Sequence, residues 1–164
     1  MDQDLISLST SVGKVLAAQQ LTISTAESCT GGLLSHVLTG ISGSSAYFIG
    51  GVVAYSNAIK KRVLGVETKT LIDHGAVSGP TARQMAEGIR KRFGTEIGLS
   101  TTGVAGPTGG TPEKPVGLVW MGISTPGKTT IIEAHFKGER LVIMRSTVIE
   151  ILTCLLDQLD FTDI

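Results

Sequence analysis

The stretch Leu21-Thr22-Ile23-Ser24-Thr25-Ala26-Glu27-Ser28-Cys29-Thr30-Gly31-Gly32-Leu33-Leu34 decides the fold, because one hydrophobic period gives way to another within it. Residues 21–26 alternate in the manner of a β-strand, and the apolar residues from Leu33 to Leu38 recur at helical spacing. We therefore predict a strand, a tight turn and a helix in that order. The turn carries the hydroxyl of Ser28 beside the thiol of Cys29.

Such a turn favours negative charge. The first N–H groups of a helix have no partner within the helix, and the helix dipole attracts anions. An anionic ligand is one occupant that fits there, and an oxyanion formed when Ser28 or Cys29 attacks a carbonyl is another. The competing interpretation is an ordinary tight turn, in which glycine supplies the geometry and Ser or Thr caps the helix.

The composition is typical of a compact globular chain. Of the 164 residues, 41% are hydrophobic and 17% are charged, which excludes extensive disorder. We predict one domain over residues 1–164, long enough to bury about 70% of its unfolded surface. The 21 glycines gather at turns without a repeat period, which indicates loops that backbone or ligand approaches closely.

Charge and hydropathy disfavour two classes of partner. The formal net charge is zero, and the basic triplets 60–62 and 90–92 are interpreted as solvated helix ends, so nucleic acid is not an expected partner. No apolar run approaches the ~20 residues that span a bilayer, and the acidic N-terminus lacks the features of a signal peptide. We therefore expect a cytoplasmic protein that does not associate with membranes.

Helices and strands alternate along the rest of the chain. The expected helices are 4–19, 31–39, 57–64, 68–74, 80–93 and one carrying residues 141–159, and the expected strands are 21–26, 47–55, 96–102, 117–124 and 129–136. Strand 47–55 has the apolar pattern of a buried strand, and Asn57 is a candidate helix cap. Residues 125–128 signal a hairpin. The expected fold is a three-layer α/β/α sandwich around a mixed, mostly parallel sheet of about five strands with an antiparallel hairpin strand.

Three segments that follow strands are expected to share one crevice, since α/β folds usually bind ligands at that edge of the sheet. Besides the turn at 27–32, these are residues 55–60 and the Gly/Pro loop at 103–117. Loops of this length are uncommon in compact domains unless they are functional. We therefore expect N–H groups of residues 103–110 to contact a ligand, with an ordinary connecting loop as the alternative.

Lys60 is a possible base for Ser28, provided that burial or nearby positive charge lowers the pKa of its amine towards neutrality. The competing interpretation is a surface-facing lysine. Tyr55 likewise has two interpretations, a half-buried aromatic residue of a strand and a proton relay. Cys29 is the alternative nucleophile, because a helix N-terminus would lower the pKa of its thiol.

The histidines and cysteines do not form a cluster with metal-ligand spacing. His36, His74 and His135 lie far apart, and Cys154 falls in an apolar helical pattern, where we expect a core residue. We therefore predict no metal site.

Short motifs follow one another over nearly the whole chain. They are Thr25-Ala26-Glu27-Ser28-Cys29-Thr30-Gly31-Gly32, Gly43-Ser44-Ser45, Tyr55-Ser56-Asn57 with Lys60, Leu64-Gly65-Val66, His74-Gly75-Ala76-Val77-Ser78, Gly103-Val104-Ala105-Gly106-Pro107 with Gly109-Gly110, and Glu113-Lys114-Pro115-Val116-Gly117. In order and spacing these motifs resemble the CinA C-terminal family, whose enzymatically active members are nicotinamide-nucleotide amidases.

The resemblance implies a hydrolase of pyridine-nucleotide salvage that needs no cofactor. Its substrate would be the small molecule nicotinamide mononucleotide, and its products nicotinic acid mononucleotide and ammonia. By the same resemblance, Ser28 would be the nucleophile, Lys60 the general base and Tyr55 an assisting hydroxyl.

The resemblance also implies the residues that bind the substrate. The backbone around Thr30 and Gly31 would form the oxyanion hole, the loop at 103–110 would hold the nucleotide, and Arg140 is a candidate for contact with its phosphate. The implied substrate-binding residues are Thr30, Gly31, Gly32, Asn57, Gly103, Ala105, Gly106, Gly109, Gly110 and Arg140.

We therefore expect a nicotinamide-nucleotide amidase that uses a Ser28–Lys60 pair. The alternatives are a non-catalytic nucleotide-binding or accessory protein and a thiol hydrolase that uses Cys29. A homo-oligomer is also expected, because the helices at both chain ends carry apolar surface.

Overall fold

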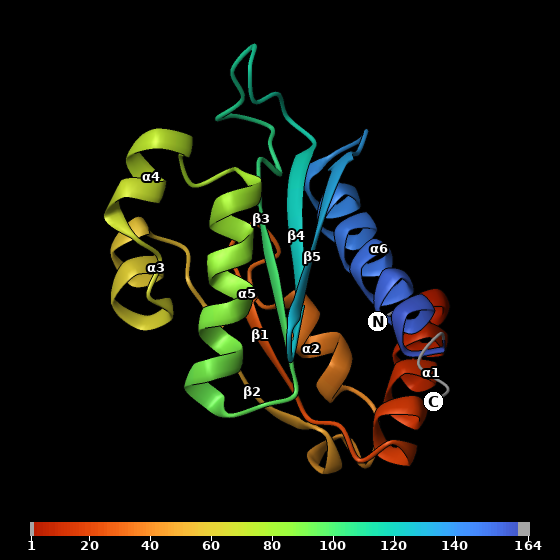
Figure 1. Cartoon of the computed structure of the whole chain (residues 1–164). Coiled ribbons are helices and arrows are strands. Elements are labelled where there is room, and N and C mark those ends of the chain that lie inside the picture. The colour runs from red at the N-terminus through yellow and green to blue at the C-terminus, as the bar shows by residue number, and fades with distance from the viewer. Residues whose placement is uncertain (1, 161–164) are drawn as a thin grey trace.

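A five-stranded sheet with the strand order β2-β1-β3-β4-β5 organises the chain in the computed structural model, which describes residues 2–160 (Figure 1). The strands are β1 Ile23–Glu27, β2 Phe48–Val53, β3 Ile97–Gly103, β4 Leu118–Thr125 and β5 Lys128–His135. The helices are α1 Gln3–Ala18, α2 Leu33–Thr39, α3 Asn57–Leu64, α4 Thr68–His74, α5 Gly79–Phe93 and α6 Arg140–Asp160, with a short 3-10 helix at Ser44–Ala46. No helix within residues 2–160 is long and apolar enough to cross a membrane.

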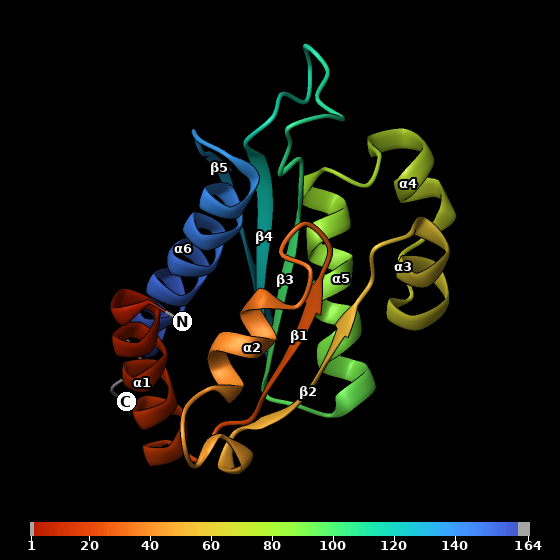
Figure 2. The ribbon, with the colours of Figure 1, turned by 180° about the vertical axis from the view of Figure 1, so that it is seen from behind.

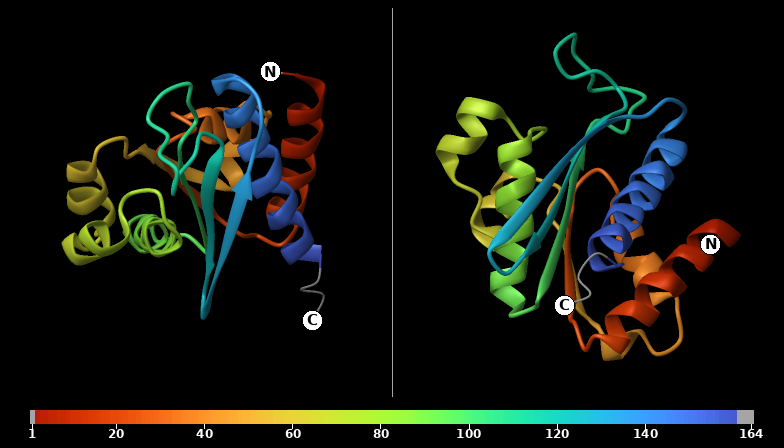
Figure 3. Two further views of the ribbon diagram at one scale, coloured as in Figure 1. Left: turned by 90° about the horizontal axis from the view of Figure 1, so that it is seen from above. Right: turned by 45° about the vertical axis from the view of Figure 1, so that its right-hand side comes forward.

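The sheet is mixed, as expected. Strand β1 pairs in parallel with β2 and β3, whereas β4 pairs antiparallel with β3 and β5. Four strands therefore point one way and β4 points the other. Helices α1, α2 and α6 cover one face of the sheet, and α3, α4 and α5 cover the other, as Figure 2 and Figure 3 show from behind and from above. The predicted three-layer α/β/α sandwich is confirmed.

Strand β2 is not the buried strand that its apolar sequence predicts. It stands at the end of the strand order and pairs within residues 2–160 only with β1. Ile49 and Val53 consequently remain about half exposed, because an apolar run by itself does not distinguish a central strand from an edge strand. The cap of the next helix also differs from the prediction. The hydroxyl of Ser56 accepts the N–H of Ile59 at 3.3 Å, and Asn57 is the first helical residue.

Apolar side chains fill the space on both faces of the sheet. The larger cluster joins the sheet to α1, α2 and α6 and includes Leu16, Leu99 and Ile151. The smaller cluster joins the other face to α3 and α5 and includes Leu64 and Met85. The helices at the two chain ends, α1 and α6, pack against each other, so their apolar faces are largely buried within the chain.

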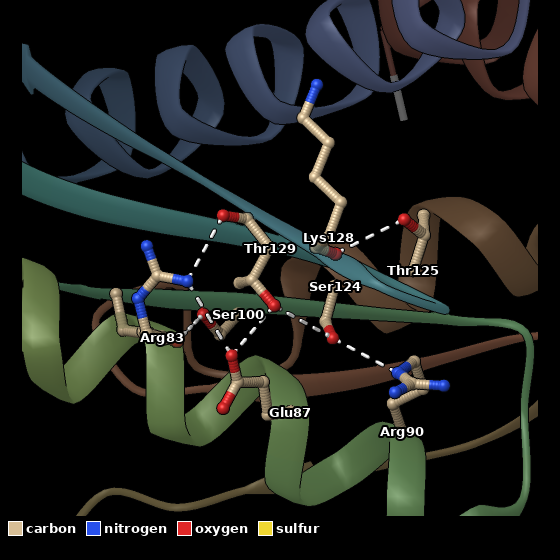
Figure 4. A network of polar contacts seen from close by, with 9 residues as sticks. Arg83, Glu87, Arg90, Ser100, Ser124, Thr125, Lys128 and Thr129 are labelled. Atoms are coloured by element: carbon tan, nitrogen blue, oxygen red, sulfur yellow. Dashed lines mark hydrogen bonds and ion pairs between the residues drawn. The ribbon is translucent and has the colours of Figure 1, made fainter.

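Polar contacts hold α5 against the β4–β5 hairpin, at the end of the sheet opposite the 27–32 turn. Figure 4 shows Arg83 donating to the carbonyl of Thr129 at 3.2 Å, and the Thr129 hydroxyl donating to the Glu87 carboxylate at 2.8 Å. Arg90 Nε also donates to the Ser124 hydroxyl at 3.1 Å. These contacts fix α5 on the sheet. The first turn of α5 in turn holds the α4–α5 connection, which lies at the end of the sheet near the 27–32 turn.

The carboxylate of Glu27, which is completely buried, organises the turn that follows β1. It accepts the Thr30 hydroxyl at 2.6 Å and the backbone N–H groups of Gly32 and Leu34 at 3.0 Å each. Ser35 donates its N–H at 2.8 Å and its hydroxyl at 2.6 Å. The carboxylate therefore takes the place at the start of α2 that an external anion would occupy.

Two glycines make this arrangement possible. Gly31 and Gly32 have φ values of +60° and +103°, in the left-handed region that residues with a side chain rarely adopt. The chain therefore reverses between β1 and α2 within a few residues, and the first N–H groups of the helix point back at Glu27.

We expect Glu27→Gln to destabilise the protein by about 2–4 kcal/mol, because an amide offers one acceptor atom and turns a donor towards other donors. Urea unfolding monitored by circular dichroism measures the change. The matched control is Glu113→Gln in the exposed loop, which we expect to stay within about 0.5 kcal/mol of the wild type. Equal stability of the two variants would contradict the role given to Glu27.

Candidate active site

A pocket of about 210 Å³ opens where β1 and β3 end, at the edge where the sequence predicts a ligand crevice. Its walls come from the 27–32 turn, the segment after β2, the connection between α4 and α5, the end of β3 and the start of α6. Figure 2 shows the turn between β1 and α2 with the segment after β2 on one side and α6 on the other. The residues that line it are Ser28, Cys29, Tyr55, Asn57, Lys60, Ala76, Val77, Thr102, Gly103, Ala105 and Arg140.

A larger cavity of about 680 Å³ lies at the opposite end of the sheet, beside the hairpin and the last turns of α6. Its walls are mostly apolar, with Leu21, Ile97 and Leu155 among them. The carboxylate of Glu96 is engaged by the N–H of Thr22 at 2.8 Å. Thr125 and Lys128 line this cavity, but the Thr125 hydroxyl donates to the Lys128 carbonyl, and within residues 2–160 no buried amine beside a hydroxyl lines it. The chemistry therefore favours the smaller pocket.

Ser28 and Lys60 meet in the smaller pocket. Ser28 stands at the end of β1, where its N–H donates to the carbonyl of Thr101 at 2.9 Å. Lys60 lies in the first turn of α3 and is 1% exposed, so the interpretation as a surface lysine is wrong. Its Nζ lies 2.9 Å from Ser28 Oγ, 2.8 Å from the carbonyl oxygen of Ala54 and 3.3 Å from that of Tyr55.

Burial favours the neutral form of the Lys60 amine. Desolvation lowers the pKa of Lys60 from its ordinary value, because the ammonium form loses its hydration. A neutral amine has two N–H bonds and one lone pair. With the N–H bonds directed to the carbonyls of Ala54 and Tyr55, the lone pair faces the hydroxyl of Ser28.

Cys29 has the opposite character. Its side chain is buried, and burial raises the pKa of the thiol to about 12, with the charge of Glu27 adding to the effect. The expectation that the helix N-terminus lowers this pKa is wrong, because the first N–H groups of α2 are directed at the Glu27 carboxylate. A buried thiol with so little thiolate is poorly suited to act as a nucleophile.

Tyr55 and Arg140 form one wall of the pocket together. Arg140 donates from Nη2 to the hydroxyl of Tyr55 at 2.9 Å and from Nη1 to the carbonyl of Gly106 at 2.9 Å. The Tyr55 residue is 60% exposed, so it is not the half-buried strand aromatic of the alternative interpretation. The guanidinium thereby links the segment after β2 to the loop after β3.

The 27–32 turn offers fewer free donors than its sequence suggests. The N–H of Gly31 donates to the carbonyl of Ser28 at 3.2 Å, and that of Gly32 donates to Glu27. The Thr30 hydroxyl is buried below the turn between Glu27 and Thr101. Among the contacts within residues 2–160, neither the N–H of Cys29 nor that of Thr30 donates to an oxygen.

Only the first residues of the loop after β3 reach the pocket. Gly103 and Ala105 line the pocket, and Gly106 borders it through Arg140. Gly109 and Gly110 are exposed and are not among the lining residues, and Figure 1 shows this loop projecting beyond the sheet.

Three further lining residues were not among the predicted site residues: Ala76, Val77 and Thr102. Ala76 and Val77 carry no reactive group. For Thr102, the one feature of the sequence that could have indicated a site residue is its position just before Gly103 at the end of β3. None of the three histidines lines the pocket, and no group of three or more His, Cys, Asp or Glu side chains within residues 2–160 is placed to hold a metal ion.

Comparison with known proteins shows the same fold over nearly the full chain. The competence/damage inducible protein CihA from Agrobacterium tumefaciens is 40% identical, with a TM-score of 0.94 and 98% coverage of both chains. A CinA superfamily protein from Klebsiella pneumoniae is 33% identical, also with a TM-score of 0.94, covering 97% of this chain and 99% of that one.

Curated relatives carry the same sequence pattern. A CinA-like protein of Salinibacter ruber is 58% identical over 82% of this chain, and a putative competence-damage inducible protein of Clostridium perfringens is 47% identical over 96% of it. The matches cover 33% and 38% of those proteins, so the chain spans about a third of their length. The model of the CinA C-terminal domain matches residues 5–159. The chain therefore belongs to the CinA C-terminal domain family.

Proposed function

We propose that the protein is a nicotinamide-nucleotide amidase, which hydrolyses the carboxamide of nicotinamide mononucleotide. The observation that carries the proposal is the buried Lys60 amine, 2.9 Å from the hydroxyl of Ser28. An amine of lowered pKa beside a serine hydroxyl is an arrangement that activates serine for attack on an acyl group. The substrate comes from the resemblance of the motifs, and the proposed role is pyridine-nucleotide salvage.

The reaction begins when Ser28 Oγ attacks the carboxamide carbon and the neutral Lys60 amine takes the hydroxyl proton. The C–O bond forms while the carbonyl electron pair moves to oxygen. When the tetrahedral intermediate collapses, the C–N bond breaks, and the Lys60 ammonium returns the proton to the leaving nitrogen as ammonia. An ester on Ser28 remains. Water then attacks the ester with Lys60 as base, Ser28 regains its proton, and nicotinic acid mononucleotide leaves.

The N–H groups of Cys29 and Thr30 are the oxyanion donors that the geometry favours. They follow the nucleophile directly, and neither is engaged by an oxygen within residues 2–160. The N–H of Gly31, a donor that the family resemblance implies, already donates to the carbonyl of Ser28. Backbone donors held by a rigid turn stabilise the developing charge without reorganising.

In this proposal the pocket holds the nicotinamide ring with its carboxamide, and the phosphate lies near the rim. Its 210 Å³ is below the volume of about 300–1,000 Å³ that encloses a drug-sized ligand. Arg140 at the edge supplies a guanidinium for the phosphate. Tyr55 can donate its hydroxyl proton to the substrate while it accepts from Arg140.

We expect purified protein to release ammonia from nicotinamide mononucleotide in the presence of EDTA. Ser28→Ala should lower kcat by roughly a thousandfold or more, because the acyl acceptor is lost. Cys29→Ala, in the same turn, is the matched control and should retain most of the activity. Activity that survives Ser28→Ala and disappears in Cys29→Ala would assign the nucleophile to the thiol. Nucleotide binding without ammonia release in the wild type would favour the non-catalytic alternative.

The pH dependence of kcat/KM tests Lys60. The base acts as the neutral amine, so activity should fall as the pH drops below the lowered pKa of Lys60, and the acidic limb should report that pKa. Lys60→Arg should be inactive, because a guanidinium stays protonated over this range. Lys61→Arg, one residue along on the exposed side of α3, should be unaffected. Near-normal turnover of Lys60→Arg would remove Lys60 from the role of base.

Arg140→Gln tests the contact with phosphate. We expect it to raise KM for nicotinamide mononucleotide by about tenfold or more, because a charge-assisted hydrogen bond to phosphate is lost. Hydrolysis of nicotinamide riboside, which lacks the phosphate, should change much less. Arg83→Gln, in the remote network of Figure 4, is the control for loss of an arginine. Equal losses on both substrates would show that Arg140 acts by holding Tyr55 and Gly106 instead.

A further inference from the structure

Thr102 lies beside Ser28 at the end of the sheet. Strands β1 and β3 pair in parallel with Glu27 opposite Thr101, and the N–H of Ser28 donates to the carbonyl of Thr101 at 2.9 Å, which continues this register. Ser28 is therefore opposite Thr102, at the strand spacing of about 4.8 Å. Because side chains alternate between the two faces of a sheet, residues opposite each other share a face. Both residues line the pocket.

The hydroxyl of Thr102 has already committed its proton. It donates to the carbonyl of Ala76 at 2.7 Å, and a carbonyl can only accept, so the direction of this bond is fixed. Thr102 is 1% exposed, and no donor within residues 2–160 is directed at its Oγ1. Ala76 also lines the pocket, so the bond runs along the pocket wall. The remaining lone pairs of Oγ1 therefore form a buried acceptor without a donor.

An acceptor of this kind distinguishes a carboxamide from a carboxylate. The nitrogen of a primary carboxamide carries two N–H donors, whereas a carboxylate offers acceptors alone. A site that binds an N–H group rejects an analogue without one, because the polar group of the site is then left unpaired. With the carbonyl oxygen directed to the N–H groups of Cys29 and Thr30, the end of β3 offers the carboxamide nitrogen an acceptor.

We propose that Thr102 determines specificity for the carboxamide, because its hydroxyl oxygen accepts an N–H of the substrate. This inference rests on the proposed function, since it concerns the same site and the same substrate. The product carboxylate meets the lone pairs of Thr102 where the amide nitrogen met an acceptor, so it is held more weakly than the substrate and leaves. The competing interpretation is that Thr102 only holds the α4–α5 connection in place through Ala76.

Three nucleotides that differ in one group test this contact. They are nicotinamide mononucleotide, its methyl ketone analogue with CH3 in place of NH2, and nicotinic acid mononucleotide. Isothermal titration calorimetry measures their binding to the Ser28→Ala protein, which lacks the acyl acceptor and so keeps the amide intact. The dissociation constant of the amide should be about tenfold lower, or more, than that of the methyl ketone and that of the acid.

Substitutions in the same background assign the preference to one oxygen. Thr102→Val removes the hydroxyl at nearly constant shape, and it should bring the dissociation constants of the amide and the methyl ketone to within about twofold of each other. Thr102→Ser keeps the hydroxyl and should keep the preference. The matched control is Ser100→Ala. Ser100 lies two residues earlier on β3, donates to the carbonyl of Ala82 at 2.6 Å and does not line the pocket, so its loss should leave the preference unchanged.

Equal weakening of all three nucleotides by Thr102→Val would overturn the inference, because a purely structural role treats the ligands alike. Absence of any amide preference in the Ser28→Ala protein would overturn it as well, whether or not Thr102→Val folds. Ammonia release by the wild type tests the amidase separately. An amide preference that needs Thr102, in a protein that releases no ammonia, would support this contact and contradict the proposed function.

Discussion

The buried carboxylate of Glu27 is the interaction on which the rest of the site depends. It gathers donors from the turn and from the first residues of α2, among them Thr30, Gly32 and Ser35. Because these donors are satisfied internally, the turn is rigid and α2 begins at one defined place. Ser28 then stands at the end of β1 with its hydroxyl directed into the pocket, and the N–H groups directly after it remain available. A single interior charge thus substitutes for the ligand that a free helix terminus would attract.

The second constraint is the burial of Lys60. Its amine donates to the carbonyls of Ala54 and Tyr55, so the segment that directly follows β2 sets the position of the amine. Ser28 directly follows β1 and Lys60 lies in α3, which follows β2, so pairing between β1 and β2 brings together the segments that carry the two groups. The same burial raises the pKa of Cys29 and lowers that of Lys60, because it disfavours whichever form is charged. One physical effect thus keeps the Cys29 thiol protonated and increases the fraction of the Lys60 amine that is neutral and able to accept a proton.

Much of the architecture follows from local patterns. The spacing of apolar residues over 21–38 predicted β1 and α2, and the turn residues at 125–128 predicted the hairpin of β4 and β5. The edge position of β2 was not predictable, because its apolar residues look the same whether another strand or solvent lies beside them. The projecting loop shows a similar limit. Its glycines suggested that residues 103–110 all contact a ligand, whereas only the first residues of the loop reach the pocket.

The sequence by itself determined the order of the elements, the sharp turn at Gly31 and Gly32, and the presence of a hydroxyl, a thiol and a lysine among the candidates. These properties depend on residues that are close together in the sequence, so their spacing can be read from the sequence alone. Only the tertiary structure decided which of these candidates lie together and in which direction burial shifts their pKa values. Ser28 and Lys60 are 32 positions apart, and their pairing, like the burial that tunes Lys60 and Cys29, exists only once separate strands and helices exclude water around them.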